Sequence, residues 1–534
     1  MNKRSVGYAI GKLLQVMAFI MFIPFFIGLY NDVPQFKISI FLGPEFLGFS
    51  LSILISWFVG FLLIAVCYRY RQEIGVREGY AVVTFGWITL SAVGCLPLFF
   101  YFVFSKDMVA ISDVVHFFSD AYFETMSGFT TTGSTILTDI ETIPKGILFW
   151  RSMTHWLGGM GIITLALAIF PAMGVSGYGM YKGEVPGPTK ERLQPRLSET
   201  AKILWGVYLL FTVLETSLLF FGGMSLFDSF CHTFGTLATG GFSTKNLSVG
   251  YYQNTYFHWV IIIFMVLSGI NYIIHYRVLL KRHYRSLFED KELHFYLATL
   301  LIGTLFVTGI LYFQGLPDTE IGYESYRYDK MSFNDFEKHM SEEEAKIDTL
   351  SGAFSQAAFQ VVSILTTTGF CTADFDVWPD VCRLVLIILM FWGGCAGSTG
   401  GGLKIIRVIT VMKISWREIK KLAKPRWISP IKIGQTSIDE RRVINILSLF
   451  NLFLLTFVIC STLMCLFIPD LLTAISCVVA TLFNIGPGLS GVGAVENYAW
   501  IPLPGKWILI MCMLMGRLEI FSVLIALRPA IWKK

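Results

Sequence analysis

Charged side chains are scarce in this chain of 534 residues: Asp, Glu, Lys and Arg make up 15% of it, whereas soluble globular domains are nearer a quarter charged. More than half of the residues, 54%, are hydrophobic, and the mean hydropathy is +0.63. This composition excludes an ordinary soluble domain. The formal net charge of +5 is small, and it gives no reason to expect a nucleic acid partner.

Motifs of catalysis and nucleotide binding are also lacking. None of the ten cysteines forms a CxxC pair, and no cluster of His, Cys and carboxylates and no nucleophile triad stands out. The glycine-rich stretches GGMGII (158–163) and GSTGGGLK (397–404) follow no strand pattern and do not fit GxxxxGK followed by Ser or Thr. We therefore expect neither enzyme activity nor a nucleotide site in this chain. A polytopic membrane enzyme that holds a phosphorylated lipid at a glycine-rich site is the alternative from another class.

Apolar runs, in contrast, are long. A helix needs about 20 mainly apolar residues to span the hydrocarbon core of a bilayer. The first run follows Lys3, Arg4 and Lys12 without a convincing small-residue cleavage site after it, so we interpret it as an uncleaved first helix. The sequence predicts an all-α polytopic membrane protein in a lipid bilayer, with the most apolar runs at 13–29, 46–66, 259–274 and 384–394.

Basic residues gather in alternate connections between these runs. The stretch 404–442 alone holds eleven Lys and Arg against three acidic residues. By the positive-inside rule such connections face the cytoplasm. The longest of the other connections, 314–348, carries ten Asp and Glu against four Lys and Arg, and we expect it outside. The predicted cytoplasmic parts are both termini and the segments 68–79, 182–196, 275–285 and 404–442.

The outward-facing connections contain apolar stretches of a length typical of re-entrant rather than spanning helices. These stretches are 114–128, 225–238, 349–365 and 471–483. Each leads into a loop that contains glycine: TTTGST (130–135), ATGGFS (238–243), TTTGFC (366–371) and FNIGPG (483–488). We call these segments the four glycine loops. They predict a unit of helix, short helix, glycine loop and helix that occurs four times around one pore.

The glycine loops are candidates for a filter that selects cations. Non-helical backbone at membrane depth must be buried in protein or line a watery cavity. Glycine allows positive φ, so successive carbonyl oxygens can point the same way, and rings of carbonyls can replace an ion's hydration shell. The short helices direct their negative C-terminal ends toward this place. The predicted filter residues are Thr131, Thr132, Gly133, Thr239, Gly240, Gly241, Thr367, Thr368, Gly369, Asn484, Ile485 and Gly486.

The repeat divides the chain into five parts. Two extra transmembrane helices are expected in 1–75, before the first repeat. The four repeats are expected in 76–175, 196–285, 290–415 and 440–534. The third repeat contains both the external insertion 314–348 and a glycine-rich segment, 393–402.

The segment 393–402 is a candidate gate. A continuous helix over 381–413 would be about 50 Å long, well beyond the hydrocarbon core, and this segment in its middle has six glycines in ten residues. We expect a broken helix whose loop lies across the pore; the alternative is a glycine-rich surface for close helix packing. The candidate residues are Gly393, Gly394, Gly397, Ser398, Thr399, Gly400, Gly401 and Gly402.

Arg517 is the second part of the candidate gate. It lies about ten residues from the external end of an apolar helix, near the middle of the bilayer, where an arginine is costly unless it faces a polar interior. We expect its side chain to project into the pore beside 393–402 and to repel cations. The alternative is a structural pairing with Glu519 or with a neighbouring carbonyl.

These motifs resemble the Trk/Ktr/HKT superfamily of potassium transporters, in which one chain carries four such repeats. The glycine loops look like degenerate relatives of the TVGYG filter of potassium channels. The stretches HWLGGMGIITL (155–165), GGCAGSTGGGLKIIR (393–407), NIGPGLSGVG (484–493) and GRLEIFSVL (516–524) narrow the resemblance to the TrkH/TrkG branch. It covers about residues 1–530, and the acidic insertion 314–348 is a departure from it.

The resemblance implies potassium uptake across the bacterial inner membrane by a homodimer with one pore per subunit. It also implies regulation by a cytoplasmic nucleotide-binding partner of the TrkA type, for which 182–202, 277–291 and 404–442 are candidate docking surfaces. In the superfamily, a serine in place of the first-loop glycine is associated with sodium transport. Gly133 stands there in this chain, which favours K⁺ with Rb⁺ tolerated. A Na⁺-permeable or cation-coupled member of the superfamily is the alternative within the same class. His155 and Arg151 are expected to have interfacial or structural roles, and His232 a packing role.

Overall fold

The computed structural model describes residues 2–32, 43–70, 75–106, 110–161, 197–319, 333–424, 430–433 and 436–532. Within these ranges the protein is helical except for one two-stranded antiparallel sheet, β1 (Lys432–Ile433) with β2 (Thr436–Ser437). The predicted cytoplasmic segment 182–196 and the middle of the external insertion lie outside the described residues.

The described residues contain six helices that are long and apolar enough to cross a membrane, or up to eight if each of two bent helix pairs counts as one span. The straight spans include α3 (Pro44–Cys67), α10 (Leu197–Phe221), α15 (Lys291–Gln314) and α21 (Glu440–Met464). Two others are built from consecutive helices: α1 (Lys3–Ile20) with α2 (Phe22–Asp32), and α4 (Val76–Gly94) with α5 (Leu96–Phe104).

Short apolar helices stand between the spans, as the sequence predicts. They are α6 (Ile111–Phe129), α11 (Leu226–Leu237), α18 (Leu350–Leu365) and α22 (Leu471–Leu482). Each is followed by a glycine loop and then by a further helix: α7 (Lys145–Gly159), α12 (Thr255–Ser268), α19 (Asp380–Met390) and α23 (Leu503–Arg517). The predicted all-α architecture of four helix, short helix, loop and helix repeats is confirmed.

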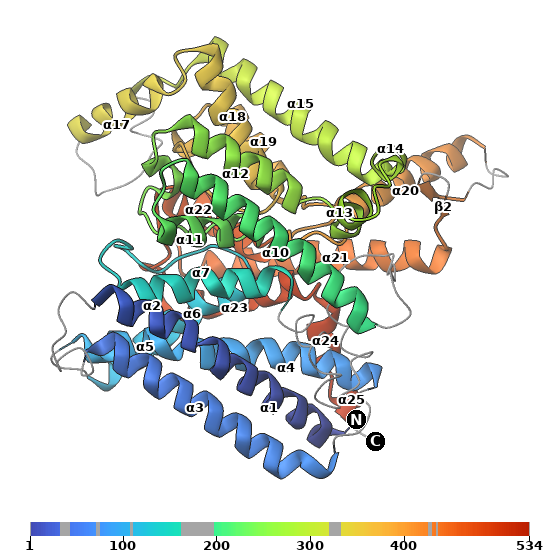
Figure 1. Ribbon diagram of the computed structural model, residues 1–534. Helices are drawn as coiled ribbons and strands as arrows, with labels where there is room; N and C mark the ends of the chain where they lie inside the picture. The colour runs from blue at the N-terminus through green and yellow to red at the C-terminus, as the bar shows by residue number, and fades with distance from the viewer. Residues whose placement is uncertain are drawn as a thin grey trace.

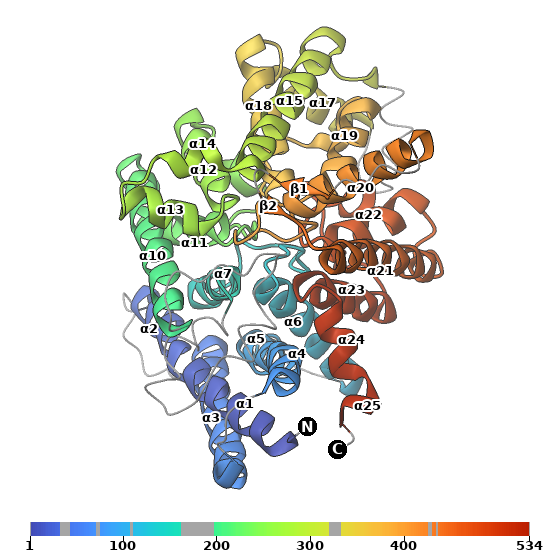
Figure 2. The ribbon, with the colours of Figure 1, turned by 90° about the vertical axis from the view of Figure 1, so that its right-hand side faces the viewer.

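The four repeats close into a ring. Within each repeat the short helix packs on the helix that follows its loop. Between repeats, α7 packs on α11, α12 on α18, α19 on α22, and α23 returns to α6. In Figure 2 these helix pairs follow one another around a common centre. The cyclic order brings loops that are more than 100 residues apart in the sequence to one axis.

The second helices of three repeats break sharply on the side of the ring that faces the chain termini, which we call the inner side (Figure 1). α12 continues into α13 (Tyr272–Leu279) after a bend of 102°, and α23 continues into α24 (Phe521–Leu527) after a bend of 112°. α19 is separated from α20 (Ile405–Ala423) by a loop of 14 residues, 391–404. These breaks are where polar groups of the backbone and side chains enter the centre of the protein.

The N-terminal helices lie outside the ring. α1 and α3 pack on each other, α1 also packs on α4, and α3 on α5 (Figure 1). The two ends of the chain lie close together. The Lys3 ammonium is 5.7 Å from the centre of the Trp532 ring in α25 (Pro529–Trp532). The termini therefore lie on the same side of the molecule.

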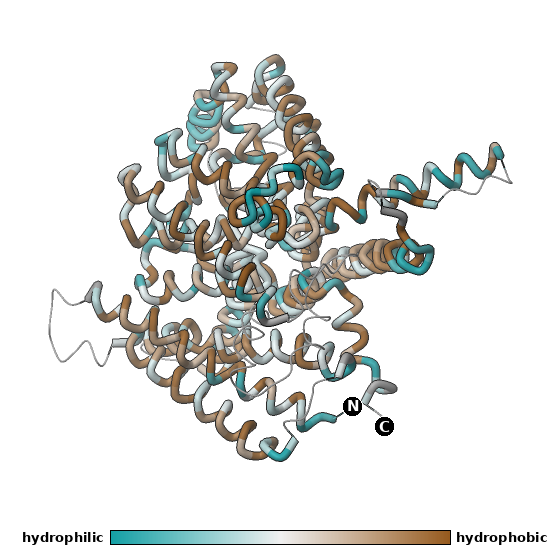
Figure 3. The backbone as a smooth tube through the Cα atoms, turned by 45° about the vertical axis from the view of Figure 1, so that its right-hand side comes forward, coloured by the Kyte–Doolittle hydropathy of each residue, from teal (hydrophilic) through white to brown (hydrophobic). Residues whose placement is uncertain are grey.

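The two sides of the molecule differ in polarity. The termini, α13, α14 (Arg285–Glu289) and the hairpin of α20 with β1 and β2 lie toward one side of the ring, and α17 (Phe333–Ala345) of the acidic insertion lies toward the other (Figure 1). Figure 3 shows hydrophobic residues along the long helices and hydrophilic residues near the termini and in the projecting α20. A concentration of basic residues on one side of the membrane is the pattern that the positive-inside rule describes.

Candidate functional site

The four glycine loops share one backbone conformation. The residue two before each aligned glycine has a left-handed φ: 52° at Thr131, 54° at Thr239, 60° at Thr367 and 56° at Asn484. The aligned glycines Gly133, Gly241, Gly369 and Gly486 also have positive φ, from 78° to 105°. Non-glycine residues seldom adopt positive φ, and such conformations persist only where the surroundings enforce them. The fourfold repetition of this conformation shows that the four loops follow one common backbone trace.

The C-terminal end of each short helix holds the start of its loop. In the first repeat, the N–H groups of Thr131 and Thr132 donate to the carbonyls of Gly128 and Ser127 at 3.0 and 2.9 Å. The same register of hydrogen bonds recurs in the second, third and fourth repeats. The loop N–H groups thereby satisfy last-turn helix carbonyls, which otherwise have no intrahelical partner.

The loops approach one another so closely that only glycine fits. A Cβ atom on Gly133 would overlap the carbonyl oxygen of Gly240, and one on Gly241 would overlap that of Thr368. A Cβ on Gly369 would overlap the carbonyl oxygen of Ile485, and one on Gly486 would lie 2.7 Å from that of Thr132. Each loop therefore presents a carbonyl to the glycine of the preceding loop. The order runs from the first loop to the fourth and back, and it closes a ring.

A cavity lies at the outer mouth of this ring. It is lined by all four aligned glycines together with polar groups that include Ser134, Ser243 and Tyr498. The Gly486 carbonyl at its edge accepts hydrogen bonds from the Tyr498 hydroxyl at 2.8 Å and the Ser134 hydroxyl at 3.1 Å. The ring is consequently not symmetric, because the fourth loop's carbonyl has side-chain donors beside it.

Side chains at one shared position behind the loops hold the outer ends of the first three, and the sequence analysis did not identify them as a set. Nine residues before the aligned glycines stand Glu124, His232, Gln360 and Cys477. Glu124 accepts from the Thr135 hydroxyl at 2.9 Å and the Ile136 N–H at 2.8 Å, and His232 Nε2 lies 3.0 Å from Ser243 Oγ. With its amide oxygen turned to the loop, Gln360 accepts from the Thr372 N–H at 2.8 Å. The constant offset from the glycine is the sequence signal that could have revealed these residues.

Arg151 joins the first loop to the second. Its Nε lies 2.5 Å from Glu124 Oε1, its guanidinium donates to the Ser243 carbonyl at 2.9 Å, and it stacks 3.5 Å from the Phe242 ring centre. Both charged side chains are almost fully buried. Arg151 and His155 are both buried, which agrees with the structural rather than the interfacial of the two roles expected for them.

On the inner side, the glycine-rich segment 393–402 lies directly beneath the ring. The Gly401 N–H donates to the Thr367 hydroxyl at 2.7 Å, so the segment contacts the third glycine loop. Cβ atoms on Gly400 and Gly401 would lie 3.0 Å from the Thr366 carbonyl oxygen and 2.8 Å from the Asn484 side chain. The ends of the segment are fixed by Glu292, which accepts from the N–H groups of Ala396 and Ile406 at 2.8 and 3.0 Å.

Other backbone contacts complete this segment. The Gly393 N–H donates to the Leu403 carbonyl at 2.9 Å, and the Gly394 carbonyl accepts from Ile405 at 3.2 Å. The Gly397 carbonyl accepts from the Tyr272 N–H at 3.1 Å, where α13 begins. Gly402 has a φ of 64°, and Thr399 donates to the Ser268 carbonyl. The helix break that the glycines predict is present, and the segment is packed against α12 and α13.

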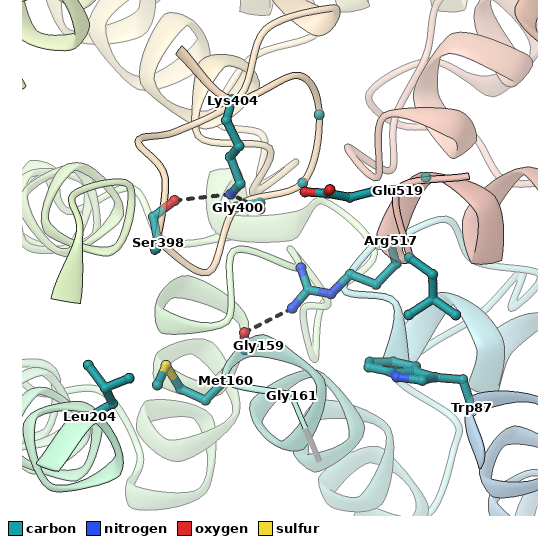
Figure 4. Close-up of a pocket in the computed structure, with 15 residues that line it drawn as sticks. Trp87, Gly159, Met160, Gly161, Leu204, Ser398, Gly400, Lys404, Arg517 and Glu519 are labelled. Atoms are coloured by element: carbon teal, nitrogen blue, oxygen red, sulfur yellow. Dashed lines mark hydrogen bonds between the residues drawn. The ribbon is translucent and has the colours of Figure 1, made fainter. Parts of the chain in front are cut away.

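Arg517 lies at the end of α23 and bridges this segment to the first repeat. Its guanidinium donates to the Thr399 carbonyl at 2.8 Å and to the Gly158 carbonyl at 2.6 Å. It also donates to the Gly159 carbonyl at 2.8 Å (Figure 4). Glu519 lies 2.6 Å from Arg407 instead. Arg517 therefore contacts segment 393–402, as expected. It also pairs with neighbouring carbonyls, which was part of the alternative.

A second cationic side chain, the buried Lys404, was missed by the sequence analysis. Its ammonium group lies 3.2 Å from Ser398 Oγ and donates to the Gly400 carbonyl. Lys404 and Arg517 line the same inner cavity, below the ring, together with Met160, Gly161 and four glycines of segment 393–402 (Figure 4). A path from the outer cavity through the ring would meet this segment and two positive charges.

Four re-entrant loops on one axis, each entered from the C-terminal end of a short helix, place the protein in the class of four-repeat cation-transport membrane proteins. A model of the TrkH family, described as cation transport proteins, matches residues 49–534, and the chain belongs to that family. Membership of this family rules against the alternative of a membrane enzyme, because its members are described as cation transport proteins.

Individual relatives match this chain over most or all of its length. The chain is 35% identical to the Trk system potassium uptake protein TrkH of Escherichia coli K12, over 100% of both chains. It is 38% identical to TrkH of Salmonella typhimurium, over 87% of this chain and 88% of that one. It also resembles the crystal structure of the potassium transporter TrkH from Vibrio parahaemolyticus, with a TM-score of 0.80, 31% identity and 100% of both chains covered.

Proposed function

We propose that this protein takes up potassium ions across the bacterial inner membrane as the channel-like translocating subunit of a Trk system. The closed ring of glycine loops carries this proposal. Thr131, Thr132 and Gly133 and their counterparts in the other loops act as the filter, because their clustered carbonyls can replace the hydration shell of a cation. The full-length relatives that are named potassium uptake proteins support the same assignment.

Glycine at all four aligned positions favours K⁺, with Rb⁺ tolerated because it is similar in size. A hydroxymethyl group at Gly133 would displace the carbonyl of Gly240 and change the cavity that the ion enters. The competing function within the same class is a Na⁺-permeable or cation-coupled transporter. Cations are the transported substrate in either case.

Segment 393–402 and Arg517 act together as the gate. The segment occupies the space under the third and fourth loops, and Arg517 holds it against the end of α7. The buried Lys404 and the half-buried Arg517 raise the energy of a cation below the filter, since electrostatic repulsion is weakly screened in a low-dielectric site. Opening requires the hydrogen bond between Arg517 and Thr399 to break.

The protein works with partners. We assign it as a homodimer with one pore per subunit, bound on its cytoplasmic side by a nucleotide-binding regulatory protein of the TrkA type. The chain itself needs no nucleotide site. Both termini face the cytoplasm, together with the basic segments 182–202, 277–291 and 404–442. These three segments are the candidate docking surfaces for the regulatory protein.

Ion flux into liposomes tests the transport assignment. Purified protein is reconstituted with an inward gradient of K⁺, Rb⁺ or Na⁺ in turn. We expect uptake of K⁺ and Rb⁺ and little uptake of Na⁺. Equal uptake of Na⁺ would favour the competing function, and no cation flux under any gradient, with or without the regulatory protein, would contradict transport.

The gate is tested by removing its two parts separately and together. Arg517→Ala and a shortened segment 393–402 should each raise K⁺ flux in the absence of the regulatory protein. The two changes should be non-additive, because both remove one barrier. Selectivity should stay largely intact. Well-folded variants with unchanged or lower flux would assign Arg517 and the segment to a structural role.

A further inference from the structure

The second glycine loop lacks a side chain that the other three loops have. Immediately before the aligned glycine stand Thr132 in the first loop, Thr368 in the third and Ile485 in the fourth, but Gly240 in the second. Backbone conformation does not require this glycine. Gly240 is absent from the positive-φ residues of the described chain, and its three counterparts carry side chains in the same trace. Some neighbouring group must therefore exclude the side chain.

The imidazole of His155 is that group. A Cβ atom built on Gly240 would fall within the His155 ring, and its three nearest atoms all belong to that ring. His155 is fully buried in α7, and its ring centre lies 3.9 Å from that of Phe242, two residues beyond Gly240. Neither ring nitrogen has a hydrogen-bond partner among the residues that the structure describes, so the ring acts here through its shape.

We propose that His155 is a specificity-determining positioning residue: its ring substitutes for the side chain that Gly240 lacks and holds the second glycine loop at the distance K⁺ selection needs. The proposal rests on the proposed filter function. It assigns no contact between His155 and the ion.

The second loop needs such support more than the others. It has two consecutive glycines, Gly240 and Gly241, and glycine loses more conformational freedom on ordering than any other residue. The Gly240 carbonyl is also the one that faces Gly133 across the ring. A radial gap of about 0.5–1 Å behind a loop already forfeits a quarter to a half of its contact energy. Loss of the ring would thus loosen a carbonyl of the filter itself.

The helix that carries His155 is held one turn before and one turn after this residue. One turn before it, Arg151 binds the Ser243 carbonyl beyond the second loop. One turn after it, the Gly158 and Gly159 carbonyls accept from Arg517. The ring is therefore fixed relative to the loop by contacts that do not involve Gly240, as a positioning role requires.

A double-mutant cycle between His155 and Gly240 tests the proposal. His155→Ala removes the ring, Gly240→Thr adds the side chain found in the first and third loops, and the double variant exchanges one for the other. The readout is the K⁺/Na⁺ permeability ratio in liposomes. We expect each single change to lower the ratio roughly tenfold, within the range of coupling found for residues in contact, and the double variant to restore most of it.

Met265→Ala is the control for a simple loss of packing, because Met265 is a fully buried side chain on α12, the corresponding helix of the second repeat. It should not be rescued by Gly240→Thr. If a single variant fails to fold, the double variant alone tests the proposal, which requires it to fold and to select K⁺ over Na⁺. A double variant no more selective than the poorer single variant would overturn the role of His155.

Gly133→Ser in the same assay separates this outcome from failure of the filter itself. If Gly133→Ser lowers selectivity and the double variant is not rescued, only the inference about His155 fails. If neither Gly133→Ser nor Gly240→Thr changes selectivity, the glycine loops are not the filter.

Discussion

The first and fourth glycine loops follow the same backbone trace but are held by different chemistry. Behind the first loop lies a buried ion pair, Glu124 with Arg151. In the fourth repeat Cys477 stands at the position of Glu124 and contacts its own helix, and the hydroxyl of Ser476 donates to the Leu489 carbonyl at 2.8 Å instead. The trace is thus set by the glycines and the left-handed residues, while the supports behind it have diverged.

This difference has an energetic consequence. A buried ion pair is costly to break, because removal of one partner leaves a charge in a low-dielectric interior. A neutral hydroxyl contributes only about 0.5–1.5 kcal/mol. The first loop should therefore be sensitive to change behind it and the fourth loop tolerant, although both contribute to one ring.

Removal of one ionic partner should have the largest effect. Arg151→Gln leaves the Glu124 carboxylate buried without its cation, at a cost of about 3–5 kcal/mol. We expect little folded protein, measured as yield of monodisperse protein and as thermal stability. The double variant Glu124→Gln with Arg151→Gln should recover much of the loss, because no uncompensated charge remains. Normal stability of Arg151→Gln alone would contradict the account of this pair.

Substitution of the aligned glycines should affect selectivity next. Gly133→Ser and Gly486→Ser both place a Cβ against a neighbouring carbonyl and both strain a positive φ. We expect the K⁺/Na⁺ permeability ratio to fall roughly tenfold or more for Gly133, which corresponds to about 1.4 kcal/mol. The fall should be smaller for Gly486, whose nearest carbonyl leaves more space at 2.7 Å. The reverse order would show that the ring is not arranged as described.

Replacement of Asn484 by threonine, the residue at this position of the first loop, should have a moderate effect on stability. The Asn484 amide donates to the Thr132 hydroxyl at 2.9 Å and the Met513 carbonyl at 3.0 Å. Asn484→Thr removes both bonds and leaves buried acceptors, at about 1–3 kcal/mol. Thermal unfolding of the purified protein measures this cost, with Asn451→Thr on α21 as a control outside the loops. A stability equal to that of the control variant would count against the assigned bonds.

Loss of the hydroxyl support behind the fourth loop should matter less. Ser476→Ala removes the bond to Leu489 at an expected cost of about 1 kcal/mol, with selectivity unchanged. The melting temperature and the permeability ratio are measured on the same preparation. A loss of selectivity as large as that of Gly133→Ser would show that this bond shapes the filter directly.

The smallest expected effect is a change with pH in the local stability of α17, which contacts the chain just after the third loop. Outside the membrane, His339 of α17 lies 3.1 Å from Asp374, and the Asp374 carboxylate raises the pKa of His339 above its usual value of 6.5. Since the folded-state pKa is raised, the stabilisation is complete below pH 6.5 and is lost as the pH rises through the folded value. Hydrogen exchange of α17 should therefore quicken as the pH is raised above neutrality, after correction for the intrinsic rate. His339→Gln should abolish this dependence, and an unchanged pH dependence in that variant would contradict the pairing.

Local pattern accounts for what could be predicted from the sequence. The short helices lie within three residues of their predicted bounds, because apolar stretches bounded by polar residues and glycines leave few alternatives. The break between α19 and α20 follows from the six glycines of segment 393–402, which lower helix propensity locally.

Contacts between distant segments account for what could not be predicted. Glu124 and Arg151, or His155 and Gly240, are brought together by the packing of α6, α7 and α11, and neither member of a pair is unusual on its own. Lys404 looked like one of many basic residues of a cytoplasmic segment, yet it is buried beneath the ring. A sequence shows where charges are, but the fold decides which of them are removed from water.

Ion density on the axis of the four glycine loops tests the central claim most directly. The protein would be imaged with Rb⁺ as the only permeant cation, using its anomalous scattering, and again with Na⁺ in its place. The account predicts Rb⁺ peaks on the axis level with Gly133, Gly241, Gly369 and Gly486, and none at these positions in Na⁺. Rb⁺ bound elsewhere in the membrane region, with no density between the loops, would contradict it.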